Sequence, residues 1–122
     1  MIIVDTSIWI DFLKQSNDEI CNSMNRYLEE NQIIGVSAVF GELLQGAKNE
    51  AEEKIIIQLW NSLPKVDESE LFIEAGLLSF RERLFSKGIG LIDSSILAVA
   101  KKNNARIWTL DKKLADQSDK FL

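Results

Sequence analysis

The sequence has 122 residues, of which 46% are hydrophobic and 27% charged, and this composition is typical of a single globular domain over residues 1–122. A chain of this length buries a core without disulfides, and its one cysteine, Cys21, has no partner within the chain. Histidine is absent, which excludes Ser-His-Asp and Cys-His nucleophilic sites, imidazole bases and His-rich zinc sites. Any catalysis must therefore depend on carboxylates, hydroxyls or lysines, with oxygen ligands for any metal.

Compartment and charge narrow the possible partners. Neither a signal-peptide pattern nor an apolar run near the ~18 residues that cross a bilayer is present, so we expect a cytoplasmic protein with no membrane segment. The net charge of −5 argues against a polyanionic partner. The charge is uneven, however, because residues 93–122 carry six basic and four acidic groups. This basic excess fits either a solvated helix surface or a contact with phosphates.

The first half of the chain begins with the β-branched run Met1-Ile2-Ile3-Val4, which is typical of a strand buried on both faces of a parallel sheet. The apolar pattern then predicts, in chain order, a helix over 6–13, an amphipathic helix over 17–30, a strand over 33–36, and helices over 38–48 and 50–60. We expect Ser37 to cap the helix over 38–48, since a serine hydroxyl accepts hydrogen bonds from a first helical turn.

The second half continues the alternation of strands and helices. Pro64 indicates that a third strand over 63–66 lies at a sheet edge. The remaining elements are, in chain order, a helix over 68–86 ended by Lys87-Gly88, an extended segment or connection over 89–92, a helix over 94–102 ended by Asn103-Asn104, a strand over 106–110 and a short helix after Asp111. This order predicts an α/β three-layer sandwich around a mostly parallel sheet, with ligands beyond the carboxyl ends of its strands.

Four carboxylates follow apolar runs instead of lying in polar stretches. Asp5 and Asp111 stand at the carboxyl ends of predicted strands, Asp93 at the amino end of a helix, and Glu42 one turn into another helix. In a right-handed parallel sheet these positions lie at one edge, so we expect the four to face one cleft. Each also has an ordinary alternative: Asp93 and Asp111 as helix caps, Asp5 as a turn residue, and Glu42 as a partly exposed helix residue.

The repulsion within such a cluster points to its chemistry. Two carboxylates about 4 Å apart repel by ~4 kcal/mol at an effective dielectric of 20, so either one acid takes up a proton or cations bridge the group. Mg²⁺ and Mn²⁺ suit a site of oxygen ligands alone. A bound divalent ion acidifies a water for attack on phosphorus, which is metal-assisted phosphodiester hydrolysis, and it also reverses the local sign of charge.

Hydroxyls and lysines accompany the acids. The hydroxyl residues beside them are Thr6, Ser7, Ser94, Ser95 and Thr109. Such groups can orient a carboxylate or a bound water, although helix capping is the simpler role for Ser94 and Ser95. Lys112 and Lys113, next to Asp111, are candidates for contacts with the phosphates on either side of the cleaved bond.

The motifs that hold these residues resemble those of PIN-domain ribonucleases, and among them the VapC toxins of bacterial type II toxin-antitoxin modules. The matching segments are, in order, Val4-Asp5-Thr6-Ser7, Glu42-Leu43-Leu44-Gln45-Gly46, Ile92-Asp93-Ser94-Ser95-Ile96-Leu97-Ala98 and Thr109-Leu110-Asp111. The resemblance implies a sheet flanked by helices and Mg²⁺- or Mn²⁺-dependent cleavage of RNA. It also implies homodimerisation, with helices such as 50–60 as a candidate interface, and inhibition by an antitoxin that covers the active site.

Carried over by motif, Asp5, Glu42 and Asp93 correspond to the core metal ligands and Asp111 to the fourth acid, while Thr6 and Thr109 correspond to supporting polar positions. We therefore predict a metal-dependent endoribonuclease whose partners are RNA, an antitoxin protein and a second copy of the chain.

The alternative function is a receiver-type phosphoacceptor signalling domain, which is also α/β, acidic and about this long. Such a domain needs paired acids after the first strand, an acceptor aspartate after the third and a lysine after the fifth. Here Thr6 follows Asp5, and Asp67 is the only candidate acceptor. The motifs therefore favour the nuclease.

Overall fold

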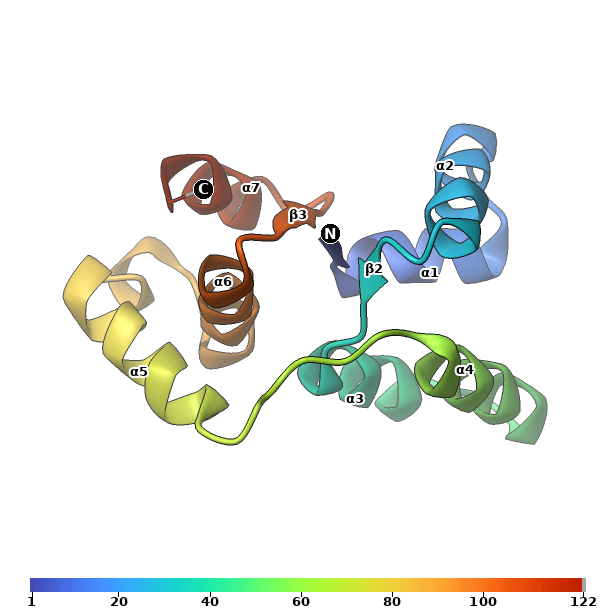
Figure 1. The fold of residues 1–122 in the computed structure, drawn as a ribbon, viewed down its shortest axis with the longest axis horizontal. Helices are drawn as coiled ribbons and strands as arrows, with labels where there is room; N and C mark the ends of the chain where they lie inside the picture. The colour runs from blue at the N-terminus through green and yellow to red at the C-terminus, as the bar shows by residue number, and fades with distance from the viewer. Residues whose placement is uncertain (122) are drawn as a thin grey trace.

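The computed structural model describes residues 1–121 and has a three-stranded sheet at its centre (Figure 1). The strands are β1 (Ile2–Val4), β2 (Ile33–Ile34) and β3 (Arg106–Trp108). They lie in the order β2-β1-β3, and both pairs are parallel. Ile3 is in register with Ile34 on one side and with Ile107 on the other. The predicted parallel sheet is therefore confirmed, with strands shorter than the sequence pattern indicated.

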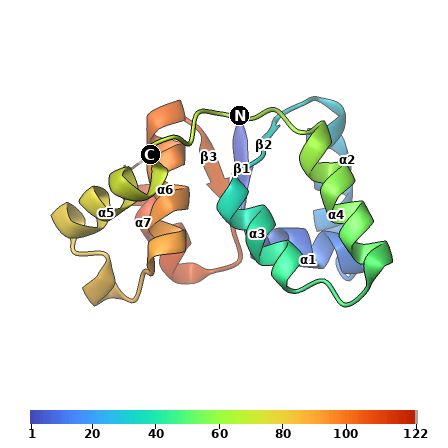
Figure 2. The same ribbon diagram turned by 90° about the horizontal axis from the view of Figure 1, so that it is seen from below.

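Helices cover both sides of this sheet. They are α1 (Thr6–Lys14), α2 (Asp18–Glu29), α3 (Ser37–Gln45), α4 (Glu50–Ser62), α5 (Leu71–Glu82), α6 (Leu91–Asn103) and α7 (Lys112–Phe121), with a 3-10 turn, η1 (Phe85–Lys87), before α6. In both views α1 to α4 lie on one side of the strands and α5 to α7 on the other (Figures 1 and 2). The predicted three-layer α/β sandwich is confirmed. Among the described residues, no helix is long and apolar enough to cross a bilayer.

The core lies where the helices meet the central strand. All three residues of β1 are buried, as expected for a strand covered on both faces. Trp9 of α1 packs edge-on against Phe40 of α3, with ring centroids 5.2 Å apart. On the other side of the sheet, Leu114 of α7 is fully buried. This packing fixes the start of α1, and with it the residues that directly follow β1.

Two predicted helix starts have different outcomes. Asn17 caps α2, because its side-chain Oδ1 accepts a hydrogen bond from the Ile20 N–H at 3.1 Å. The prediction that Ser37 caps the next helix is wrong, since α3 begins at Ser37 itself with Val36 in the cap position. A distant carboxylate replaces the local cap: Glu68 accepts hydrogen bonds from the Ser37 N–H at 3.1 Å and from its hydroxyl at 3.0 Å.

The predicted edge strand over 63–66 is absent as a strand. Only an isolated parallel bridge joins Lys65 to Gly35, in which the Gly35 N–H donates to the Pro64 carbonyl at 2.9 Å. Pro64 has no N–H to donate, so it cannot continue a ladder. The chain between α4 and α5 therefore runs beside β2 without extending the sheet.

The predicted helix over 68–86 is shorter than expected. The helix α5 ends at Glu82 because Arg83 adopts the left-handed conformation, with φ of 54°. This turn lets Leu84 reach the core, where it is fully buried. Gly88, predicted to end the long helix, instead ends η1 with φ of 81°.

The helix α6 begins at Leu91, three residues earlier than predicted, and Gly90 takes its cap position. Residues 89–90 are thus a connection, and Asp93 lies inside the first turn of α6 instead of capping it. Ser95 does not cap the helix either, since its hydroxyl donates to the Ile92 carbonyl at 2.5 Å. The predicted end of this helix is confirmed, because Asn104 is left-handed with φ of 52°.

Candidate active site

Asp5 directly follows β1 and is only 6% exposed. Its N–H donates to the Trp108 carbonyl at 2.9 Å, which continues the pairing of β1 with β3. The carboxylate Oδ2 accepts hydrogen bonds from Thr109 Oγ1 at 2.7 Å and from Ser7 Oγ at 3.0 Å. Two hydroxyls on one oxygen fix the orientation of the carboxylate, and within residues 1–121 no donor occupies Oδ1. The free oxygen is therefore available for a ligand.

The same two hydroxyls hold the loop after β3. Ser7 Oγ accepts a hydrogen bond from the Leu110 N–H at 3.0 Å, and Thr109 Oγ1 accepts one from the Asp111 N–H at 2.9 Å. Each hydroxyl thus receives a backbone proton from the loop and gives its own proton to Asp5. Sequence reasoning included Ser7 among the hydroxyls that can orient a carboxylate, but did not place it with Thr6 and Thr109 among the supporting polar positions. Its position two residues after Asp5 was the available signal.

Asp111 lies beyond this loop, exposed at the start of α7. Its Oδ1 accepts hydrogen bonds from the Lys113 N–H at 2.8 Å and the Leu114 N–H at 3.2 Å. The alternative role as a helix cap is therefore observed for Asp111. The cap uses one carboxylate oxygen and fixes the side chain beside Asp5 and its hydroxyl partners.

Glu42 approaches the site from α3, where its side chain is exposed. Its Oε1 accepts a hydrogen bond from Thr6 Oγ1 at 2.8 Å, across 36 residues of sequence. Thr6 is the first residue of α1, directly after Asp5. This bond therefore places the Glu42 carboxylate next to the end of β1.

Asp93 joins the group through α6. Its side chain is half-buried, and its pKa is raised from 3.8 to about 6 by burial and by the charges of three neighbouring carboxylates. Those carboxylates belong to Asp5, Asp111 and Glu42. All four acids singled out from the sequence therefore lie in one electrostatic neighbourhood, at the carboxyl ends of the strands, which is the lower edge of the sheet in Figure 2.

The donor chemistry of this group suits a hard divalent cation. Carboxylate and hydroxyl oxygens are the ligands that Mg²⁺ and Mn²⁺ prefer, whereas zinc sites use Cys or His, and this chain has no His. The four carboxylates do not surround a single point. Among the described residues, no three of them are placed to hold one metal ion together. Burial and, after it, the repulsion of the neighbouring carboxylates raise the pKa of Asp93.

The two candidate RNA-binding lysines lie at the start of α7, and both side chains are exposed. The side chain of Lys113 extends over Gly88, where its Nζ lies 2.9 Å from the position that a Cβ of residue 88 would occupy. Glycine at position 88 therefore permits both the left-handed backbone conformation and the close approach of the Lys113 side chain. Lys113 thus covers the turn that precedes α6.

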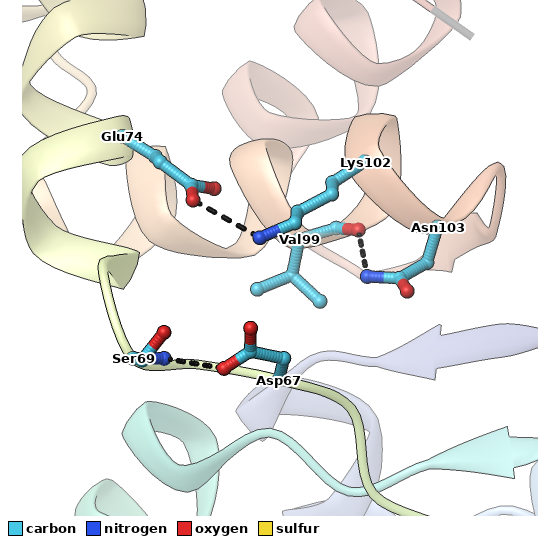
Figure 3. Close-up of polar contacts among 6 residues, drawn as sticks. All are labelled: Asp67, Ser69, Glu74, Val99, Lys102 and Asn103. Carbon is cyan, nitrogen blue, oxygen red and sulfur yellow. Dashed lines mark hydrogen bonds and ion pairs between the residues drawn. The ribbon is translucent and has the colours of Figure 1, made fainter.

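Asp67 lies in the segment between α4 and α5, beside Ser69 (Figure 3). Its Oδ1 accepts a hydrogen bond from the Ser69 N–H at 2.9 Å, which lowers the pKa of this exposed carboxyl. The charge of Lys102 adds to that lowering, and Lys102 lies about 13 Å along α6 from Asp93. No third sheet strand precedes Asp67 in the described chain, so the receiver-type alternative, which requires one, is wrong.

Comparison with known proteins agrees with this geometry. Residues 2–120 match the PIN domain family. The chain belongs to that family. It is 30% identical over 118 residues to Ribonuclease VapC32 of Mycobacterium tuberculosis, in strains CDC 1551 / Oshkosh and ATCC 25618 / H37Rv, with 93% of this chain and 87% of that protein covered. The predicted membership in the PIN family, with homology to VapC ribonucleases, is therefore confirmed.

The fold also resembles a chain in the crystal structure of VapBC2 from Rickettsia felis bound to a DNA fragment from their promoter. The TM-score is 0.73 at 24% sequence identity, and the match covers 100% of this chain and 96% of that chain. At this identity the likeness establishes the PIN-like fold.

Proposed function

We propose that this PIN domain is a metal-dependent endoribonuclease that hydrolyses RNA phosphodiester bonds, and that it is the toxin of a toxin-antitoxin pair. The observation that carries the proposal is the gathering of four carboxylates at one edge of the sheet, where burial of Asp93 and the charges of Asp5, Asp111 and Glu42 raise the pKa of Asp93 to about 6. The homology to VapC ribonucleases supports RNA as the substrate. We also propose a cytoplasmic location for the protein.

The residues have distinct proposed roles. Asp5, Glu42 and Asp93 would hold Mg²⁺ or Mn²⁺, with Asp111 as the fourth acid. When bound, such an ion acidifies a water and stabilises charge at phosphorus. Thr6 holds Glu42, while Ser7 and Thr109 hold Asp5. The exposed residues Lys112 and Lys113 are proposed to bind phosphates on either side of the cleaved bond.

The direct test is cleavage of RNA by the purified chain with and without divalent metal. We expect cleavage with Mg²⁺ or Mn²⁺ and none in excess EDTA, because the carboxylates alone supply no activated water. Metal at 100 times its dissociation constant should also stabilise the native state by ~2.7 kcal/mol, measured by urea unfolding. Undiminished cleavage in EDTA, or a stability that saturating metal leaves unchanged, would contradict the metal-dependent mechanism.

Ser7 offers a test of how Asp5 is held. In Ser7→Ala, Asp5 Oδ2 keeps Thr109 as a partner, while Leu110 loses the acceptor of its N–H. Loss of a group that orients a metal ligand typically weakens metal affinity ~10- to 100-fold. We expect a decrease of about that size in Mn²⁺ affinity by calorimetry, and no decrease in Ser16→Ala, whose hydroxyl bonds the Asp11 carbonyl. Equal affinities in the two variants would remove the positioning role from Ser7.

We also propose an antitoxin protein as the partner of this chain. A groove of about 270 Å³ lies beside Glu42, between α1, α3 and α4. Its apolar lining consists of Ile10, Leu13, Leu43, Ala47, Ile55 and Ile56. An apolar segment of an antitoxin bound there would lie next to the acidic cluster and exclude RNA. A neighbouring open reading frame that encodes a small DNA-binding protein, and inhibition of cleavage by that protein, would support this; an uninhibited nuclease would oppose it.

A further inference from the structure

Phe85 is the most exposed large apolar side chain of the described residues, with 85% of its surface exposed. Its neighbour Leu84 is fully buried, and so is Ile89 at the end of the same turn. The left-handed conformation of Arg83, with φ of 54°, ends α5 and lets Leu84 enter the core. The fold therefore places a phenylalanine in solvent between two core residues, where no other described residue covers it.

The turn that carries Phe85, residues 83–88, has an ordered backbone. The Leu84 carbonyl accepts a hydrogen bond from the Ile89 N–H at 3.0 Å, and the Phe85 carbonyl accepts one from the Gly88 N–H at 3.1 Å. These bonds fix the point from which the Phe85 ring extends. Because the backbone is already ordered, a ligand that contacts the ring has a smaller entropic cost of binding.

The 83–88 turn borders the candidate active site. The side chain of Lys113 covers Gly88, with its Nζ 2.9 Å from the position that a Cβ of residue 88 would occupy, and the Lys113 N–H donates to Asp111 Oδ1 at 2.8 Å. On the other side of the turn, Asp93 lies in the first turn of the helix that follows it, α6. In Figure 2 the connection between α5 and α6 lies toward the lower side of the molecule, the side at which the four acids are gathered.

The charge around Phe85 is positive, although the chain carries −5 overall. Residues 80–88 hold three basic residues and one acidic residue, which gives a net charge of +2. Arg83 is exposed, as are Lys112 and Lys113 at the start of α7. Cations beside an exposed aromatic ring are typical of surfaces that bind single-stranded nucleic acid, with phosphates at the cations and bases stacked on the ring. An apolar protein surface would match the ring and leave the cations unpaired, so RNA accounts for both features.

We propose that Phe85 is a substrate-binding residue, whose ring stacks on an unpaired base of the RNA strand beside the cleaved bond and so selects single-stranded RNA. This inference rests on the proposed function, because it assumes that RNA lies at the four acids. Stacking accepts every base but requires that the base is not paired, so Phe85 distinguishes single strands from duplexes and not one sequence from another. The ring takes no part in breaking the bond, and its contribution is to binding.

The first test is steady-state cleavage of a short single-stranded RNA of mixed sequence by Phe85→Ala. We expect KM to rise about tenfold with little change in kcat, because the lost stacking stabilises the bound substrate and the transition state equally. The matched control is Phe72→Ala, since Phe72 is also exposed but lies at the opposite end of α5, and its KM should equal that of the wild type. An unchanged KM in Phe85→Ala would overturn the inference and leave the proposed function intact. A wild type that cleaves no RNA would instead overturn the proposed function, and this inference with it.

Two further variants separate stacking from apolar contact. Phe85→Trp keeps an aromatic face, whereas Phe85→Leu keeps an apolar side chain without one, so we expect the KM of the wild type in the first and that of Phe85→Ala in the second. In the Asp5→Asn background, which leaves the RNA uncut, a fluorescent purine analogue in the RNA should be quenched by stacking when residue 85 is aromatic and not when it is leucine. Binding of a duplex of the same sequence should not differ among the variants. Equal behaviour of the tryptophan and leucine variants, or equal losses for single strand and duplex, would exclude stacking.

The salt dependence of binding tests the cations beside the ring. For a single strand, each lost phosphate contact lowers the slope of log affinity against log salt concentration by ~0.7. We expect a decrease of about that size in Arg83→Gln and none in Lys54→Gln, since Lys54 is exposed on α4, across the sheet from the turn. Phe85→Ala should weaken binding at every salt concentration with the slope unchanged. Equal slopes in Arg83→Gln and Lys54→Gln would mean that the 83–88 turn does not contact the RNA backbone.

A contact of Phe85 with another protein chain is the alternative that remains to be tested. Analytical ultracentrifugation of Phe85→Ala without RNA measures it directly, and we expect the same mass as for the wild type. A changed mass would assign the exposed ring to a protein interface and overturn its role in binding RNA.

Discussion

Asp5→Asn is expected to lower the rate of RNA cleavage about a thousand-fold or more while leaving the fold intact. The amide oxygen of asparagine still accepts the hydrogen bonds of Ser7 and Thr109, so the local structure is retained. The variant loses the negative charge that a divalent cation requires, and the stabilisation that a metal provides at phosphorus is worth several kcal/mol. Glu42→Gln should act in the same way, because Thr6 still has an oxygen acceptor.

A matched control separates this effect from a general loss of acidic charge. Asp67→Asn likewise removes one carboxylate, which accepts a hydrogen bond from the Ser69 N–H. Asp67 lies near Lys102, at the end of α6 opposite to Asp93. We expect full cleavage by Asp67→Asn under single-turnover conditions, with the helical circular dichroism unchanged in all three variants. Cleavage by Asp5→Asn at the rate of the control would reject the carboxylate mechanism.

The sequence predicted that the four acids of the candidate site lie near one another, because its main signals are short-range. A parallel strand buried on both faces produces a continuous apolar run, so the residue that ends the run, Asp5, lies at a sheet edge by topology alone. Asp111 lies three residues beyond β3, an edge strand whose residues are exposed or half-buried, so the apolar run before it located it less directly. The position of Asp93 was predicted correctly but not its local role, because Gly90 and not Asp93 begins α6.

The contacts that hold the site in place are long-range and left no pattern in the sequence. The hydroxyl of Ser7 is visible two residues after Asp5, but its bond to the Leu110 N–H spans 103 residues. Glu68 replaces Ser37 as the cap of α3 across 31 residues. Which apolar residues of a helix are buried also depends on the tertiary structure. The sequence therefore could not show that Ile73 and Phe80 are exposed while other apolar residues of α5 are buried.

The second large effect concerns stability in the absence of metal, and its direction follows from Asp93. The pKa of this carboxyl is about 6 in the folded protein and 3.8 in its ordinary state. Between these values the folded chain binds a proton that the unfolded chain does not, so the free energy of unfolding falls as pH rises from about 4 to 6 and stays lower above. Each pKa unit corresponds to ~1.4 kcal/mol, and partial exposure reduces this, so we expect a loss on the order of 1–2 kcal/mol.

Asp93→Asn removes the ionisable group and should therefore be more stable than the wild type in EDTA at pH 7.5, by about the amount that the wild type loses. The two proteins should converge near pH 4, and urea unfolding at one fixed protein concentration measures both values. Saturating Mn²⁺ should reverse the order, since only the wild type keeps the full set of carboxylates. A metal-free Asp93→Asn variant less stable than the wild type at pH 7.5 would mean that burial and the neighbouring charges do not destabilise the ionised Asp93. The gain of stability with loss of cleavage would show that the four carboxylates are held together for binding a cation, at the expense of the metal-free fold.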